Sequence, residues 1–193
     1  ARQAYYAALH FTDTQIGRIW AAMDRLQLWD RTIVVLLGDH GYHLGERSDF
    51  YGKGLLSELA CRAPLIIAVP GLARGRTSPR IVELVDLYPT LADLCGVNAP
   101  ATLAGRSLRP LLKDPDASWP HAAYTVTAFA GRNEIRARSV RTERWRYTES
   151  LAPQAVAELY DHRADPHEWR NLAADPRHAR TVAELHVLLR END

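Results

Sequence analysis

A run of branched aliphatic side chains from Ile33 to Leu37, ending at Gly38, is the feature that most constrains what this chain can fold into. Because no polar residue interrupts it, the run is typical of a strand that is buried on both faces of a parallel sheet. Residues 64–69 repeat the pattern and end at Pro70. We therefore expect an α/β architecture, with a partial parallel or mixed sheet layered with helices.

Residues 5–28 have the periodicity of a helix that covers such a sheet. Apolar side chains recur at steps of three and four residues, which places them on one face of an amphipathic helix. Those side chains are Ile16, Ile19, Trp20, Met23 and Leu26. A shorter helix is expected over residues 86–94, with Pro89 in its first turn and Gly96 as its stop.

The second half of the chain has a different pattern. Short β-rich runs predict a small antiparallel sheet, and they lie at residues 122–129, 135–141, 145–148 and 157–160. A terminal helix, capped by Asp175 with Pro176 at its first position, is expected to pack against that sheet.

A boundary between the two halves is expected near residues 113–116, whose sequence Lys-Asp-Pro-Asp is typical of a linker. Residues 1–113 would then carry the α/β sheet. Residues 114–193 would form a small C-terminal α+β subdomain.

The charge balance excludes several classes of partner. The chain has 24 Lys and Arg against 23 Asp and Glu, so no field of one sign favours nucleic acid or an anionic membrane surface. No apolar run reaches the ~20 residues of a membrane span. We expect a soluble protein, with periplasm and cytoplasm both open, and a chain that begins inside a domain.

The polar stretch from Asp39 to Gly54 is long for a connection in a compact domain, which favours a functional loop. It begins where the first buried strand ends, and ligands of α/β sheets gather at the carboxyl ends of strands. Asp39 and His40 are adjacent there. A carboxylate is a natural ligand of a hard divalent cation such as calcium, and an imidazole is a less usual one. The alternative, of equal weight on spacing alone, is that Asp39 caps a turn and His40 is a polar loop residue.

Three more residues of this loop are weaker candidates. Lys53 carries a compact positive charge suited to an anionic oxygen, although a solvated surface lysine has the same sequence signature. His43 and Glu46 could line a pocket or transfer a proton, or they could only make hydrogen bonds within a turn.

In their order along the chain, these residues and their surroundings resemble the type I sulfatases of the alkaline-phosphatase superfamily. The blocks that carry the resemblance are Tyr5–Ala8, Asp13–Arg18, Asp30–Val35, Gly38–Gly41, Leu44–Glu46, Lys53, Glu58, Arg62–Ile66, Val85–Gly96, Gly105–Leu108, Ser139–Thr142, Trp145–Tyr147, Glu158–Asp161, Asp165–Glu168 and Asn171–Leu172. In detail, residues 5–17 and 81–94 are most similar to iduronate-2-sulfatase-like members, with choline-sulfatase-like enzymes second. The resemblance implies an alkaline-phosphatase-like fold for residues 1–113.

The resemblance also implies a calcium-dependent sulfuric ester hydrolase. Asp39 and His40 would then be calcium ligands, Lys53 would be the catalytic residue that contacts the sulfate group, and His43 would border the substrate entrance. The substrate would be a small-molecule or saccharide sulfate ester. Residues 47–52 depart from the family pattern before the lysine, which leaves the identity of that ester open.

A sulfatase needs a nucleophile that these 193 residues do not supply. The family converts the Cys or Ser of a Cys/Ser-x-Pro-x-Arg motif to formylglycine, and neither Cys61 nor Cys95 lies in such a motif. The paired acidic metal ligands near the family's N-terminus are missing as well. The chain is expected to be the C-terminal portion of a sulfatase, inactive alone, with the N-terminal portion of its own fold as partner.

Two other functions remain open from the sequence. One is a non-catalytic module that keeps sulfatase-like packing and binds an anion. The other is a phosphodiesterase or phosphonate hydrolase of the same superfamily, because those relatives share the Asp-His-Gly end of the strand.

Overall fold

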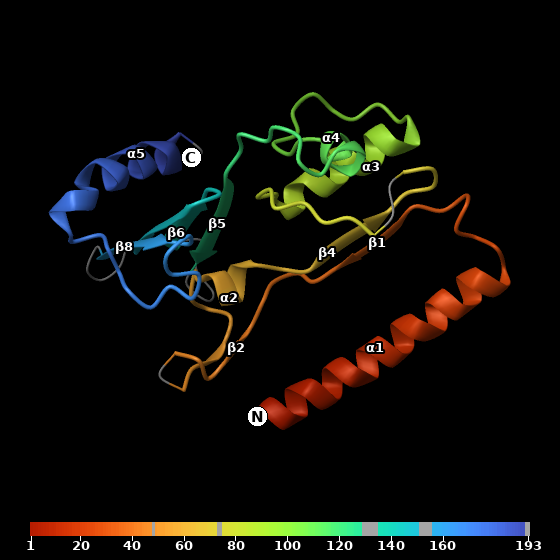
Figure 1. The fold of residues 1–193 in the computed structure, drawn as a ribbon, viewed down its shortest axis with the longest axis horizontal. Coiled ribbons are helices and arrows are strands. Elements are labelled where there is room, and N and C mark those ends of the chain that lie inside the picture. The colour runs from red at the N-terminus through yellow and green to blue at the C-terminus, as the bar shows by residue number, and fades with distance from the viewer. Residues whose placement is uncertain (48, 73–74, 129–134, 151–155, 192–193) are drawn as a thin grey trace.

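The computed structural model describes residues 1–47, 49–72, 75–128, 135–150 and 156–191. Figure 1 shows a long helix, a central two-stranded ribbon, a group of short helices beside that ribbon, and a small sheet covered by the last helix. The predicted division at residues 113 and 114 stays a prediction.

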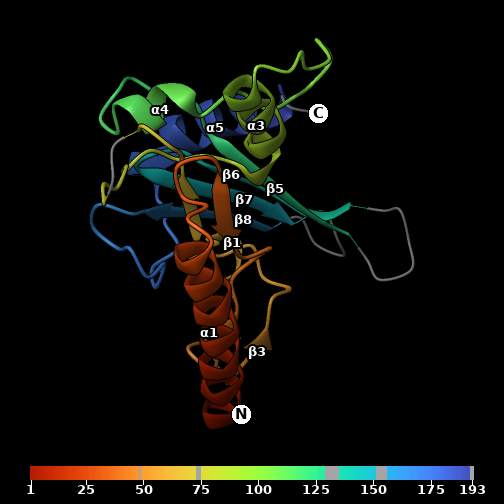
Figure 2. The same cartoon turned by 90° about the vertical axis from the view of Figure 1, so that its right-hand side faces the viewer.

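Helix α1 spans Arg2–Arg25 and confirms the predicted N-terminal helix. Within it only Met23 is buried, while Phe11 and Ile19 are 66% and 61% exposed. In Figures 1 and 2 the helix extends away from the small sheet. The expected apolar face is therefore present, but the described chain covers only part of it, and Ile19, Trp20 and Leu26 stay exposed. None of the helices described, α1 included, combines the length and the apolar character that a membrane crossing requires.

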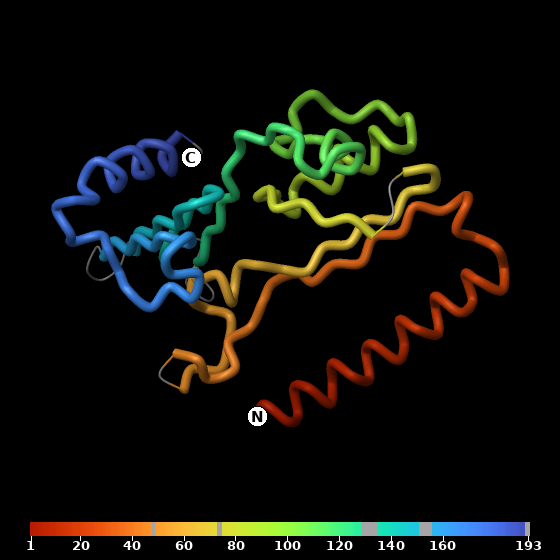
Figure 3. Tube along the Cα trace, viewed as in Figure 1, coloured from red at the N-terminus to blue at the C-terminus, as the bar shows by residue number. Residues whose placement is uncertain are grey.

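The central ribbon consists of β1 (Val34–Leu37) and β4 (Leu65–Ala68), which pair antiparallel, with Val34 opposite Ala68. Figure 3 traces the two strands as neighbouring runs through the middle of the molecule. The expected parallel sheet is wrong for the described residues, in which every strand pair is antiparallel. A parallel pair needs a long crossover, usually a helix. Here the chain instead returns beside β1 through a hairpin and one helical turn.

That return contains three short elements: β2 (His43–Leu44), β3 (Tyr51–Gly52) and α2 (Glu58–Cys61). Strands β2 and β3 pair antiparallel. The N-terminus of α1 contacts this hairpin, because Arg2 Nε donates to the Leu44 carbonyl oxygen at 2.6 Å. The predicted functional loop therefore folds into a hairpin and a helical turn.

Three short helices follow β4 along the chain, and the last of them packs against that strand. They are η1 (Leu84–Asp86), α3 (Leu87–Cys95) and α4 (Arg109–Lys113), and α3 ends at Gly96 as predicted. Leu108, Leu111 and Trp119 form a buried cluster that also contacts Leu65 and Ile67 of β4. This cluster joins residues on both sides of the predicted boundary.

The C-terminal sheet has the order β5-β6-β7-β8, with every neighbour antiparallel, which confirms the prediction. Its strands are β5 (Ala123–Ala128), β6 (Ile135–Arg141), β7 (Trp145–Ser150) and β8 (Val156–Asp161). The last residue of the first predicted run, Phe129, lies outside the described residues.

The terminal helix also forms where the sequence predicted it. Asp175 accepts a hydrogen bond from the Arg177 amide at the start of η2 (Pro176–His178), and α5 (Ala179–Arg190) follows. The buried core between α5 and the sheet is hydrophobic and contains Val140, Tyr147, Leu159, Leu185 and Leu189, and the Tyr147 hydroxyl donates to Glu149.

Replacing Leu159 by alanine should lower the free energy of unfolding by about 2–5 kcal/mol, because Leu159 is 0% exposed and the deletion leaves a cavity. Val156→Ala, on the same strand but 50% exposed, should cost about 0.5 kcal/mol or less. Urea denaturation of both variants measures the difference. Equal losses would show that the core does not lie between β8 and α5.

Candidate active site

The three residues predicted to act together lie together in the structure. Asp39 and His40 follow the end of β1, and Lys53 follows β3. Lys53 Nζ lies 2.5 Å from His40 Nε2, and His40 Nε2 lies 3.3 Å from Asp39 Oδ2. The side chain of Asp39 is 85% exposed and that of His40 is 32% exposed. A carboxylate, an imidazole and an ammonium group therefore meet at an accessible surface.

The hydrogen bonds of His40 indicate which of its two ring nitrogens carries a lone pair that can bind a cation or accept a hydrogen bond. Nδ1 lies 2.7 Å from the Gly41 carbonyl oxygen, and because that oxygen can only accept, Nδ1 is assigned the proton. The Nε2 lone pair is then free to accept from Lys53 or to bind a cation. Asp39 Oδ1 accepts from the His40 amide at 3.0 Å, which leaves Oδ2 beside Nε2.

This pair of ligand atoms fits part of a divalent cation site. The Lys53 ammonium contacts the imidazole lone pair, so a cation that binds Nε2 would have to displace it. Calcium takes six to eight ligands, mostly oxygens. Two residues therefore cannot complete a calcium site, and further ligands would have to come from other residues.

The tight turn that presents Asp39 and His40 depends on Gly41. The Gly41 amide donates to the Ala60 carbonyl oxygen of α2 at 2.8 Å. A Cβ atom at this position would lie 2.0 Å from the Leu59 carbonyl oxygen, a contact with backbone that cannot rotate away. The glycine that follows the Asp-His pair is thus required by the close approach of the turn to α2.

His43 and Glu46 lie in different environments, the first buried and the second exposed. His43 is fully buried, its Nε2 lies 2.7 Å from Ser57 Oγ, and its ring packs edge-on against Phe50. Burial, followed by the nearby Arg47 charge, lowers the pKa of His43. A neutral imidazole at pH 7 therefore links the hairpin to the start of α2. Glu46 is exposed and accepts from the Leu44 amide.

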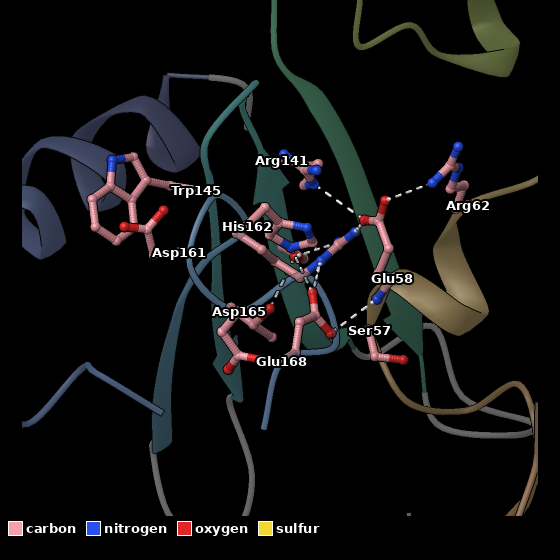
Figure 4. A network of polar contacts seen from close by, with 12 residues as sticks. Ser57, Glu58, Arg62, Arg141, Trp145, Asp161, His162, Asp165 and Glu168 are labelled. Atoms are coloured by element: carbon pink, nitrogen blue, oxygen red, sulfur yellow. Dashed lines mark hydrogen bonds and ion pairs between the residues drawn. The ribbon is translucent and has the colours of Figure 1, made fainter. Parts of the chain in front are cut away.

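A second polar cluster, which sequence reasoning missed, connects α2 to the C-terminal sheet (Figure 4). We call it the ion network, and its members are Glu58, Arg141, Arg146, His162 and Glu168. Arg146 donates to Glu58 Oε2 and to Glu168 Oε1, each at 2.7 Å. All of these residues except His162 lie in the family blocks of the sequence, but the blocks are far apart and their spacing does not show that the side chains meet.

The ion network is better suited to its own arginines than to a metal. Ligand atoms of Glu58, His162 and Glu168 lie within 4.8 Å of one another, which is close enough to hold an ion. However, the guanidinium of Arg146 contacts both carboxylates, and Arg141 Nε donates to Glu58 at 3.1 Å. These cations already neutralise the carboxylates, so we assign the network to structure.

The same contacts set the protonation state of the two glutamates. Burial by itself would raise the pKa of Glu58, but the charges of Arg141 and Arg146 hold it below its ordinary value. Burial likewise opposes ionisation of Glu168, while the hydrogen bond from His162 and the charge of Arg146 lower its pKa. Both side chains are therefore carboxylates at neutral pH.

The family model that matches this chain and two similar proteins all belong to the sulfatases. Residues 45–193 match the family described as N-sulphoglucosamine sulphohydrolase, C-terminal. A sulfatase of Formosa agariphila is 33% identical over 187 residues, covering 97% of this chain and 35% of that protein. Arylsulfatase K of Rattus norvegicus is 33% identical over 181 residues, covering 90% of this chain and 32% of that protein. The chain thus spans about a third of the length of these relatives.

Solved structures agree with this result. A protein in complex with its substrate D-glucosamine-2-N,6-O-disulfate has a TM-score of 0.84 and 32% identity, over 93% of this chain and 37% of that one. A phosphonate monoester hydrolase from Silicibacter pomeroyi has a TM-score of 0.81 and 30% identity, over 93% and 38%. A 2-O GAG sulfatase has a TM-score of 0.70 and 32% identity, over 84% and 36%.

Gly41→Ala should displace the Asp39–His40 turn from α2 and cost about 1–3 kcal/mol of stability, because its Cβ would overlap the α2 backbone. Gly54→Ala is the matched control, since a Cβ at Gly54 meets nothing within 4 Å. Thermal unfolding of both variants checks the difference. A stable Gly41→Ala variant would mean that the turn does not need this close approach.

The unfolding free energy should fall as the pH drops below 4.5, the ordinary pKa of a glutamate. The folded pKa values of Glu58 and Glu168 lie below it, so their contribution is complete above 4.5 and is lost as the pH falls through the lowered values. Urea unfolding from about pH 6 to about pH 3 measures this slope. Glu58→Gln should flatten the slope, and the exposed control Glu184→Gln should not. Identical slopes in wild type and Glu58→Gln would contradict the assignment.

Proposed function

Since this chain belongs to the N-sulphoglucosamine sulphohydrolase C-terminal family of sulfatases, we propose that it forms one side of the active site of a calcium-dependent sulfuric ester hydrolase. The observation that carries the proposal is the contact of Lys53 with His40, beside Asp39. It joins two ligand types of a divalent cation to a positive charge suited to a sulfate oxygen.

Each residue of this cluster has a proposed role. Asp39 and His40 would hold calcium through a carboxylate oxygen and through Nε2, the nitrogen that the Gly41 carbonyl leaves unprotonated. Calcium, when bound, would polarise the sulfate oxygens and lower the pKa of the nucleophile. Lys53 would donate a hydrogen bond to the sulfate group and stabilise the charge that develops there. His43 would act beneath the substrate entrance, since its ring is buried.

The nucleophile would come from polypeptide outside these 193 residues. We propose formylglycine, as in the family, and an inactive chain when these residues are alone. The uncovered apolar surface supports this view, because Phe11 and Ile19 of α1 and Ile66 of β4 are each more than half exposed. The N-terminal portion of the same fold would cover these side chains.

We propose a sulfated saccharide as the substrate class. The support is the similarity to a protein solved with D-glucosamine-2-N,6-O-disulfate and to a 2-O GAG sulfatase. The 2-O GAG sulfatase among the similar structures makes a 2-O-sulfated sugar one candidate within this class. Residues 47 and 49–52, which precede Lys53 in the hairpin, would contribute to the choice of sulfated saccharide.

A phosphonate hydrolase is the second candidate, favoured by the TM-score of 0.81 with the Silicibacter pomeroyi enzyme. The same ligand pair and lysine could bind a phosphonate as well as a sulfate. A panel of aryl sulfate, aryl phosphonate and phosphodiester substrates, tested on the full-length protein, distinguishes the two. Preferred turnover of the phosphonate would replace our proposal, and binding of sulfate without any turnover would favour a non-catalytic module.

Lys53→Met should lower kcat/KM for a sulfate ester in the full-length protein by about 10²–10³-fold, as removal of one charge-stabilising donor does. Lys113→Met removes the other lysine of the chain, at the end of α4, and should leave turnover unchanged. Steady-state kinetics check both variants. Unchanged kcat/KM in Lys53→Met would rule out the role proposed for this residue.

A further inference from the structure

Helix α2 is the element through which the candidate site is held in place. The Gly41 amide donates to Ala60, which ties the Asp39–His40 turn to α2. His43 contacts Ser57, the residue before α2, which ties the β2–β3 hairpin to the same helix. Both halves of the Asp39–His40–Lys53 cluster therefore depend on where α2 lies.

The N-terminus of α2 lacks its usual local cap. Ser57 is at the N-cap position but makes no side-chain cap hydrogen bond, and its hydroxyl contacts His43 instead. The first amide of a helix needs an acceptor, and a carboxylate there is favoured by the helix dipole. Glu168 supplies it, since its Oε2 accepts from the Glu58 amide at 3.0 Å although 110 residues separate the two in sequence.

Glu168 also contacts the hairpin directly. Its carbonyl oxygen accepts from Arg47 Nη2 at 2.6 Å, and the Arg47 guanidinium lies over the ring of Tyr160 on β8. Glu168 itself has a φ of 58°, a left-handed conformation that few residues other than glycine adopt, and its side chain is 1% exposed. The backbone is thus in a costly conformation that directs this carboxylate inward toward α2 (Figure 4).

We propose that Glu168 is a positioning residue for the proposed sulfatase site. It fixes α2 through the Glu58 amide and fixes the hairpin through Arg47, and the C-terminal subdomain thereby sets the place of Lys53 relative to His40. Glu168 contacts neither substrate nor metal in this role. The inference rests on the proposed function for its effect on turnover, but its effect on the fold of the site is independent of that function.

Hydrogen–deuterium exchange on the full-length protein tests the local effect. Glu168→Gln keeps the shape and the backbone contact with Arg47 but removes the charge at the start of α2, and the amides of residues 57–61 should exchange about 10-fold faster, while those of α3 keep their rates. Glu184→Gln, an exposed glutamate of α5, is the matched control and should change none of these rates. Unaltered exchange at residues 57–61 in a folded Glu168→Gln variant would overturn the proposal.

A second pair of variants keeps the test decisive if Glu168→Gln does not fold. Arg47→Met removes only the hairpin contact, from a partly exposed side chain, and should speed exchange at residues 41–47 and 49–52 without a change in thermal stability. Arg47→Lys can still donate to the Glu168 carbonyl oxygen and should restore most of the protection. Equal exchange in wild type, Arg47→Met and Arg47→Lys would contradict the proposal.

Kinetics separate this inference from the proposed function. If the full-length protein hydrolyses sulfate esters, kcat/KM should fall about 10-fold in Arg47→Met and recover in Arg47→Lys, because small displacements of catalytic groups are costly. If it hydrolyses none, the proposed function fails, and the exchange rates alone still decide whether Glu168 positions α2. Normal turnover by Arg47→Met would count against the positioning role.

Discussion

The contact between Arg146 and the carboxylates of Glu58 and Glu168 is the interaction on which the arrangement of this molecule depends. Both carboxylates lie 2.7 Å from the guanidinium, and the side chains of Arg146 and Glu168 are 2% and 1% exposed. Charges this deeply buried are costly unless paired and hydrogen-bonded, and removal of one partner typically costs about 3–5 kcal/mol. The network therefore strongly favours one relative placement of α2 and the C-terminal sheet.

The candidate site follows from that placement by a short chain of contacts. Helix α2, fixed to the sheet by Glu58, is also the surface against which the Asp39–His40 turn closes. A glycine at position 41 is the only residue type that permits this approach, because a Cβ would overlap the α2 backbone. The hairpin then brings Lys53 back to His40. The Asp39–His40 turn and the C-terminal sheet are thus linked through one helical turn.

Local patterns in the sequence predicted the regular elements well where their partners are neighbours along the chain. The C-terminal sheet is a meander of adjacent strands, and the terminal helix begins at its predicted Asp-Pro cap, so short-range signals were sufficient. The direction of the β1–β4 pair was not predictable in this way, because a continuous aliphatic run describes burial and contains no information on strand direction. The apolar face of α1 was predicted correctly, yet the described chain leaves most of it exposed.

The sequence by itself determined the family resemblance, most helices and strands, and the choice of Asp39, His40 and Lys53 as candidates, because these depend on residue type and on short spacings. Only the tertiary structure decided that these three side chains meet, that His43 is buried, and that Glu168 caps a helix more than a hundred residues away. The physical reason is that contacts between distant segments depend on how packing and buried charge orient whole elements, and no local pattern encodes that orientation.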